Sequence, residues 1–290
     1  MIELFIVSLL WSFSFVIIKG SLADVNSAFA SAVRMILSML VFLPLVRPRG
    51  LRGALVAKLM ALGGLQFGLM YVCYMASFAY LPAYMLVLLT TTTPLLVVFF
   101  DMLFSGRVVP VFWLAALLAV AGAVLLVRQD EALTLPWRGV LLLQLSNAAF
   151  ALGQVWYRKL ASDNPTLRDT NVYAIVYAGA ALVCVAASLY RGTFSADDVT
   201  PRQWGSLVYL GVIASGLCFF LWNRGATKVG AGTLALMNNL KIPLGAAVSI
   251  LVLKEPFKAG PLLASVALFT AALALCRRAD RQMRMALVNK

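Results

Sequence analysis

A lysine lies in the middle of an apolar run. Lys241 stands about eleven residues from either end of the run 230–253. In a helix that is roughly 16 Å from each membrane surface, beyond the ~6 Å reach of a lysine stem. A charge at that depth costs on the order of 3 kcal/mol or more unless it faces a wet cavity or a partner. Asn238 and Asn239 lie within one turn, and Pro243 frees backbone carbonyls. Lys241 therefore either binds a carboxylate or other anionic group of a substrate, or is held by carbonyls and asparagines.

Other polar side chains recur inside apolar runs. A stripe of polar side chains on a helix in lipid should face a cavity or another helix. Threonine hydroxyls either line a cavity or donate a hydrogen bond to a backbone carbonyl of their own helix near a kink. Such threonines are Thr90 to Thr93, which precede Pro94. Trp11 either stacks on a substrate or packs against other aromatic rings. The predicted substrate-binding residues are Trp11, Ser14, Gln66, Tyr74, Thr90, Gln144, Asn147, Gln154, Asn238, Asn239 and Lys241.

A second buried cation is predicted at Arg34, about seven residues inside the run 28–46. It either lines the transport pathway, or pairs with helix termini or with Asp24.

The acidic residues do not suggest a proton relay. Such relays use Asp, Glu or His within the membrane. The chain has no histidine, and Glu3, Asp101 and Glu255 all lie near the ends of apolar runs. Facilitated diffusion, exchange, and proton uptake through Lys241 all remain open. The four cysteines form no CxxC pair. We therefore expect no cofactor, no metal site and no catalytic residues.

The composition makes lipid the main solvent of this chain. Of the 290 residues 62% are hydrophobic and 12% are charged, and the mean hydropathy is +0.93. Soluble domains carry about twice that share of charged residues. The net charge of +13 is typical of basic cytoplasmic loops, so we expect membrane lipids as partners rather than nucleic acid.

Ten apolar segments are long enough to suggest membrane helices. A hydrocarbon core about 30 Å thick needs roughly 20 apolar helical residues. With the N-terminus inside, most Lys and Arg fall in cytoplasmic loops, which predicts cytoplasmic termini and a multi-pass protein of a bacterial inner membrane. Trp137, Trp156, Trp204 and Trp222 are expected to be anchors at the membrane interface. The segments are 2–18, 28–46, 57–79, 82–105, 110–127, 138–157, 171–190, 204–222, 230–253 and 259–276.

The two halves of the chain are similar. Residues 81–94 can be aligned with 230–243: small residues open each segment, a polar cluster follows, and then a proline. Each half has five segments, an odd number, so the second repeat would enter the membrane from the opposite side. Inverted repeats commonly place a substrate site near the midplane between them. We predict an all-α fold with repeats at 1–130 and 131–280, and a basic cytoplasmic tail at 281–290.

The chain resembles the EamA-type branch of the drug/metabolite transporter superfamily over nearly its whole length. This resemblance implies ten helices, a central cavity lined mainly by the first, third, fourth, sixth, eighth and ninth of them, and alternating access, often for export of amino acids or other metabolites. The family's glutamate after the fourth helix of a repeat is present as Glu255, taken as structural, but the first half has Gly106 there. The resemblance rests on Leu10-Trp11, Phe15, Lys19, Val33-Arg34, residues 76–83, Gly232 to Pro243 and residues 253–256.

These features predict a secondary transporter rather than an enzyme. Its substrate would be a small metabolite, an amino acid or another carboxylate-bearing or zwitterionic solute that is either imported or exported. The transporter would be a monomer or a homodimer. Two alternatives remain open: a channel-like or non-transporting assembly protein, and a broad-specificity drug or amine exporter. An intramembrane enzyme would need paired carboxylates, a metal cluster or an activated nucleophile, and the sequence suggests none.

Overall fold

The computed structural model describes residues 1–22, 24–47, 51–81, 83–125, 136–192, 194–196, 199–252 and 259–288. Within these ranges the chain is all-helical and has no strand. The predicted segments coincide with helices because backbone groups in lipid must pair within their own segment. The helices are α1 (Ile2–Ser21), α2 (Ser27–Phe42), η1 (Leu43–Leu45), α3 (Gly53–Gly63), η2 (Gly64–Leu69), α4 (Met70–Ser77), α5 (Ala83–Thr90), α6 (Thr93–Ser105), α7 (Pro110–Val124), α8 (Trp137–Asp163), α9 (Asp169–Tyr190), α10 (Pro201–Tyr209), η3 (Leu210–Leu217), α11 (Cys218–Ala226), α12 (Ala231–Val252) and α13 (Ala259–Val288).

Several helices are long and apolar enough to cross a membrane, so this is a multi-pass membrane protein. Among the described residues there are 7 such spans, and Ile2–Ser14 and Pro110–Val124 are shorter apolar helices. The spans are Ser27–Leu45, Gly53–Ser77, Met85–Ser105, Trp137–Asp163, Asp169–Tyr190, Pro201–Ala226 and Gly260–Gln282.

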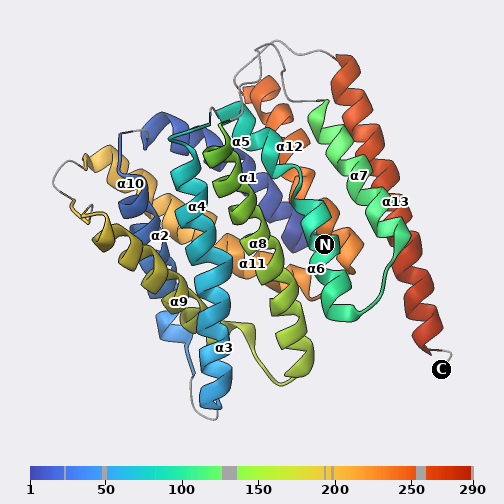
Figure 1. Cartoon of the computed structure of the whole chain (residues 1–290), viewed down its shortest axis with the longest axis horizontal. Coiled ribbons are helices and arrows are strands. Elements are labelled where there is room, and N and C mark those ends of the chain that lie inside the picture. Colours follow the sequence, from blue (N-terminus) through green and yellow to red (C-terminus); the bar gives the residue numbers. More distant parts are fainter. Residues whose placement is uncertain are drawn as a thin grey trace.

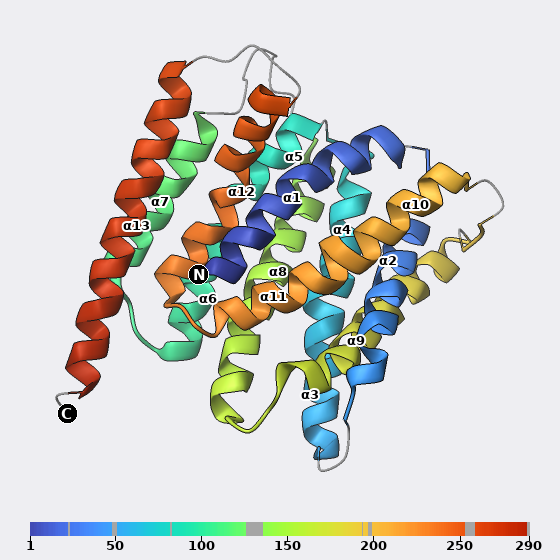
Figure 2. The ribbon, with the colours of Figure 1, turned by 180° about the vertical axis from the view of Figure 1, so that it is seen from behind.

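The two halves of the chain are interleaved rather than set side by side. At one edge of the bundle α7 packs along α13, and at the opposite edge α2 packs along α9 (Figures 1 and 2). Between these edges α1 packs on α12, and α8 packs on both α4 and α6. Contacts between the halves therefore surround the centre of the bundle, where a substrate site would lie.

Two spans contain π-helical turns. η2 interrupts the span of α3 and α4, and η3 interrupts the span of α10 and α11. π-Helical turns widen a helix locally and are frequent at functional sites. Both lie next to residues that form the site described below.

Glycines allow α3 and α9 to cross with their backbones in contact. A Cβ added at Gly63 would lie 1.8 Å from the carbonyl oxygen of Val176, and one added at Gly179 would lie 2.0 Å from that of Met60. Small residues at helix crossings provide close packing in membranes, where lipid removes most of the hydrophobic drive.

We expect Gly179→Ala to lower the free energy of unfolding by about 1–3 kcal/mol, as overpacking does. The backbone of Met60 cannot move aside as a flexible side chain would. Thermal unfolding of the purified protein in detergent measures the effect. Gly260→Ala is the matched control, because a Cβ there would meet nothing within 4 Å. Equal melting temperatures for the two variants would contradict the backbone-contact argument.

Candidate functional site

A cavity lies where helices of both halves meet. It comprises about 720 Å³ of space without protein atoms, a volume that also counts open solvent. Its walls come from α1, α2, α4, the α5–α6 region, α8, α11 and α12. The lining residues are Trp11, Ser14, Ile18, Arg34, Met70, Tyr71, Tyr74, Thr90, Thr93, Ser146, Asn147, Phe150, Phe219 and Lys241.

Lys241 places an ammonium group in this cavity. Its Nζ lies 5.8 Å from the ring centroid of Trp11, a cation–π distance. Within the described part of the chain it has no hydrogen bond and no ion pair. The neighbouring asparagines bond elsewhere: Asn238 to Gln154 and to a carbonyl of its own helix, and Asn239 to a carbonyl beside the α5–α6 turn. The ammonium group is therefore available to an anionic ligand.

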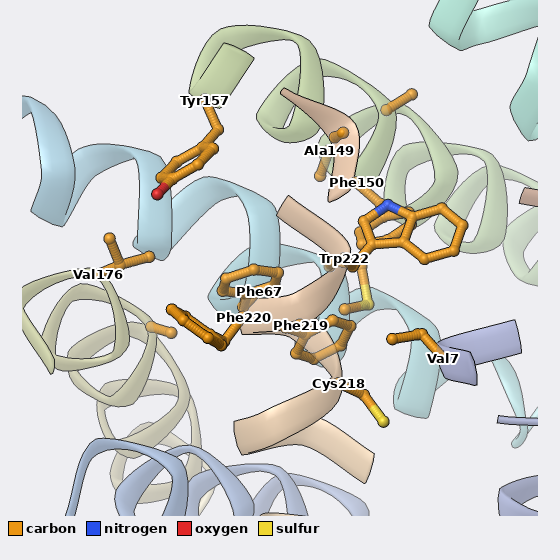
Figure 3. Close-up of a cluster of buried hydrophobic side chains, with 14 of the residues drawn as sticks. Val7, Phe67, Ala149, Phe150, Tyr157, Val176, Cys218, Phe219, Phe220 and Trp222 are labelled. Carbon is orange, nitrogen blue, oxygen red and sulfur yellow. The ribbon is translucent and has the colours of Figure 1, made fainter. Parts of the chain in front are cut away.

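An aromatic wall adjoins the lysine. The ring of Trp11 lies 6.0 Å from Phe150, 5.4 Å from Phe219 and 5.0 Å from Trp222, measured between centroids. Its Nε1 donates to the carbonyl of Ala214 at 2.8 Å, which fixes the ring. Figure 3 shows Phe150, Phe219 and Trp222 gathered in one cluster. Such a wall suits the apolar part of a ligand.

Arg34 is the second cation of the cavity and is only 3% exposed. Its Nε and NH2 groups donate to Ser215 Oγ at 3.2 and 3.0 Å, and NH2 also donates to the hydroxyl of Tyr71. The guanidinium carbon lies 4.5 Å from the centroid of the Tyr71 ring. Arg34 thus lines the cavity, and among the described residues Asp24 forms no ion pair with it.

The threonine run breaks a helix. α5 ends at Thr90 and α6 begins at Thr93, and each hydroxyl from Thr90 to Thr93 donates to the carbonyl three residues earlier at 2.6 to 2.8 Å. Pro94 has no N–H for the carbonyl of Thr90, and the hydroxyl of Thr93 takes its place. Thr90 and Thr93 also line the cavity.

The aligned segment in the second half behaves differently, because α12 continues through Pro243 without a break. Amide side chains bind carbonyls around the α5–α6 break instead. Asn147 and Gln144 donate to the carbonyl of Leu89 at 3.0 and 3.4 Å, and Asn239 donates to that of Thr91 at 2.9 Å. Of these three amides only Asn147 also lines the cavity. These amides tie α8 and α12 to the broken helix.

Another group of predicted residues forms a buried amide cluster outside the cavity lining. Gln66 and Asn223 exchange two hydrogen bonds of 2.8 Å. Gln154 and Asn238 exchange bonds of 3.4 and 3.2 Å, and Trp222 Nε1 donates to Gln154 at 2.9 Å. The expectation that Trp222 is an interface anchor is wrong. Its side chain is fully buried because its N–H has an acceptor inside the bundle.

Of the predicted binding set, the structure brings Trp11, Ser14, Tyr74, Thr90, Asn147 and Lys241 to the cavity, together with Arg34. Gln66, Gln144, Gln154, Asn238 and Asn239 are not among the lining residues. Glu255 lies outside the described residues. Nothing in the sequence distinguishes five further lining residues, because they are apolar or small residues within apolar runs: Ile18, Met70, Ser146, Phe150 and Phe219.

Comparison with known proteins agrees with this architecture. The model of the EamA-like transporter family matches residues 1–128 and 137–277. A biotin transporter of Escherichia coli (strain K12) is 41% identical over 251 residues, 86% of this chain and 83% of that protein. A probable biotin transporter of Pseudomonas aeruginosa is 41% identical over 285 residues, 97% of this chain and 99% of that protein. A solved structure, 20% identical over 97% of each chain, has the same fold with a TM-score of 0.78. The chain therefore belongs to the EamA-like transporter family, a family of transporters and not of enzymes.

Proposed function

We propose that this chain is a secondary transporter whose substrate is biotin. The observation that carries the proposal is Lys241, an ammonium group in a central cavity with no acidic partner among the described residues. The relatives described above, which match most of the chain and bear the name biotin transporter, support the choice of substrate.

Biotin matches the chemistry of the cavity walls. Its carboxylate, on a flexible aliphatic chain, suits the ammonium group of Lys241. Its apolar chain and fused ring suit the wall of Trp11, Phe150 and Phe219. This choice is narrower than the amino acid or other carboxylate expected from the sequence. A cationic amine or drug fits poorly, because both charges of the described lining are positive and would repel it.

We infer that the chain crosses a bacterial inner membrane ten times, as two inverted five-helix repeats at 1–130 and 131–280. The 7 spans together with α1, α7 and α12 give this number. The π-helical turns η2 and η3, each in the third span of its half, support the repeat. The distribution of Lys and Arg supports cytoplasmic termini, including the basic tail 281–290.

We further infer that the described conformation is closed toward the cytoplasm. Along their helices Gln66, Gln154, Asn223 and Asn238 all lie toward the end of the bundle at which α1 begins, beyond the cavity lining. Trp222, which donates to Gln154, lies in a cluster of buried hydrophobic side chains (Figure 3).

Ion pairs join the two halves at the same end. Glu3, on the first turn of α1, lies 3.2 Å from Arg224 and 2.6 Å from Lys228, and Asp101 lies 2.9 Å from Arg158. No ion pair of the described residues joins the halves at the other end. Opening this end and closing the other would deliver the substrate, as alternating access requires.

We expect proteoliposomes containing the protein to accumulate radiolabelled biotin by counterflow when they are preloaded with unlabelled biotin. A carrier exchanges bound substrate faster than it returns empty, whereas a channel shows no such exchange. Initial rates at increasing biotin concentration should saturate. Empty liposomes and liposomes preloaded with a neutral sugar are the controls. Unsaturable flux would favour the channel alternative, and absence of biotin flux would refute biotin as the substrate.

A further inference from the structure

We infer that Arg34 recognises the uncharged end of the substrate, donating from NH1 to a single carbonyl oxygen. This inference rests on the proposed function, and in biotin that oxygen belongs to the ureido group. Biotin would then lie between two cations, with its carboxylate at Lys241 and its ring carbonyl at Arg34.

An unused donor on Arg34 is the first observation. The Nε and NH2 groups are bound to Ser215 and Tyr71, but NH1 is buried and has no hydrogen-bond partner. A buried donor without a partner costs about 1–3 kcal/mol, more for a charged group. Since the side chain lines the cavity, a ligand oxygen is the partner that would remove this cost.

The donors that remain decide which end of the substrate each cation takes. An arginine holds a carboxylate best with two parallel N–H bonds from its fork. Ser215 and Tyr71 already occupy two of the three nitrogens, so Arg34 offers NH1 alone. One nitrogen suits one carbonyl oxygen. Lys241 has all three ammonium donors free of described partners, and its point charge suits the carboxylate.

Aromatic rings link the two cations along the wall of the cavity. Next to Lys241 is Trp11, whose ring is 5.4 Å from that of Phe219, and Phe219 is 5.8 Å from Tyr71, on which Arg34 stacks. An elongated ligand with an apolar middle and an acceptor at each end matches this arrangement. A ligand with only a carboxylate would leave NH1 unpaired.

The test compares ligands that lack one end of biotin. Lipoate keeps a carboxylate on an aliphatic chain and a sulfur ring but has no ureido group, whereas biotin methyl ester has no charge. Dissociation constants are measured by isothermal titration on detergent-purified wild type, Arg34→Lys and Arg34→Gln. We expect both Arg34 variants to lose at least tenfold in affinity for biotin and less than threefold for lipoate. The preference of each variant for biotin over its methyl ester should persist.

Ser38→Ala is the matched control. Ser38 lies one turn from Arg34 on α2 and donates to the carbonyls of Arg34 and Gly211, but it does not line the cavity. It should leave the biotin-to-lipoate ratio unchanged. If Arg34→Gln fails to fold, Arg34→Lys, which keeps the buried charge, decides the question.

The possible failures are distinguishable. Equal weakening of biotin and lipoate in folded Arg34→Lys would overturn the inference, because it would assign Arg34 a structural or carboxylate-binding role. Loss of the preference for biotin over its methyl ester in an Arg34 variant would also overturn the inference. Wild type that does not bind biotin at all would instead refute the proposed function.

Discussion

Lys241→Ala is expected to reduce biotin uptake about a hundredfold, because the variant would have a lower affinity for biotin. Truncating one member of a desolvated, hydrogen-bonded charge pair costs about 2–5 kcal/mol, and about 2.7 kcal/mol is a hundredfold. No other cation of the described lining can replace it, since Arg34 is held by Ser215 and Tyr71 on another wall. Initial rates of radiolabelled biotin uptake into proteoliposomes, taken over a range of biotin concentrations, separate affinity from turnover.

Three comparisons sharpen this test. Lys241→Arg keeps the charge and should retain more uptake than Lys241→Ala. Lys58→Ala removes an exposed lysine of α3 and should transport at the wild-type rate. Biotin methyl ester, which lacks the charge, should bind wild type and Lys241→Ala about equally. If folded Lys241→Ala protein binds biotin with wild-type affinity, Lys241 has a structural role and does not bind the substrate.

The features that are best predicted from the sequence are those that the lipid environment requires. Helical segments were predictable because every backbone group in a membrane must pair locally. Lys241, Trp11 and Asn147 were predictable as cavity residues because polar groups at that depth must turn away from lipid. The structure places all three in one cavity.

The same argument could not distinguish residues that line the cavity from buried residues whose hydrogen-bonding groups pair with one another. Gln66 and Asn223 each carry an amide donor and an acceptor, so the pair completes itself across 157 positions of the chain. The two aligned segments, 81–94 and 230–243, show a similar limit of prediction from the sequence. A proline follows both polar clusters, yet the first helix breaks and the second continues. At the break the hydroxyl of Thr93 donates to the carbonyl that Pro94 frees, and Asn239 donates to the carbonyl of Thr91 from a distant helix.

Trp222 and the close α3–α9 crossing depend on distant contacts. A tryptophan near the end of an apolar run is usually an interface anchor, but here an acceptor on α8 keeps it inside. Nothing in the sequence around Gly63 and Gly179 shows that each lies against the backbone of the other helix. What the sequence misses is therefore long-range pairing rather than local structure.

Gly153→Ala is expected to reduce biotin transport at least tenfold by disturbing the end of the bundle that we propose is closed toward the cytoplasm. A Cβ on Gly153 would lie 2.2 Å from Cβ and 2.9 Å from Cα of Gln66, so the backbone of η2 would have to move. Moving Gln66 breaks its two bonds with Asn223 and leaves buried amides unpaired, which costs about 1–3 kcal/mol for each group. The conformation that we propose is closed toward the cytoplasm would then be less populated.

Two measurements together test this mechanism. Counterflow gives the rate, and amide hydrogen exchange reports whether η2 and α11 open more often in Gly153→Ala than in wild type. Gly205→Ala is the control, because a Cβ there would meet nothing within 4 Å. Faster exchange in η2 with slower transport is the expected pair of results. Wild-type transport despite faster exchange would show that the Gln66–Asn223 pair stabilises the bundle without gating it. The proposed cytoplasmic closure would then rest on the Glu3 and Asp101 ion pairs.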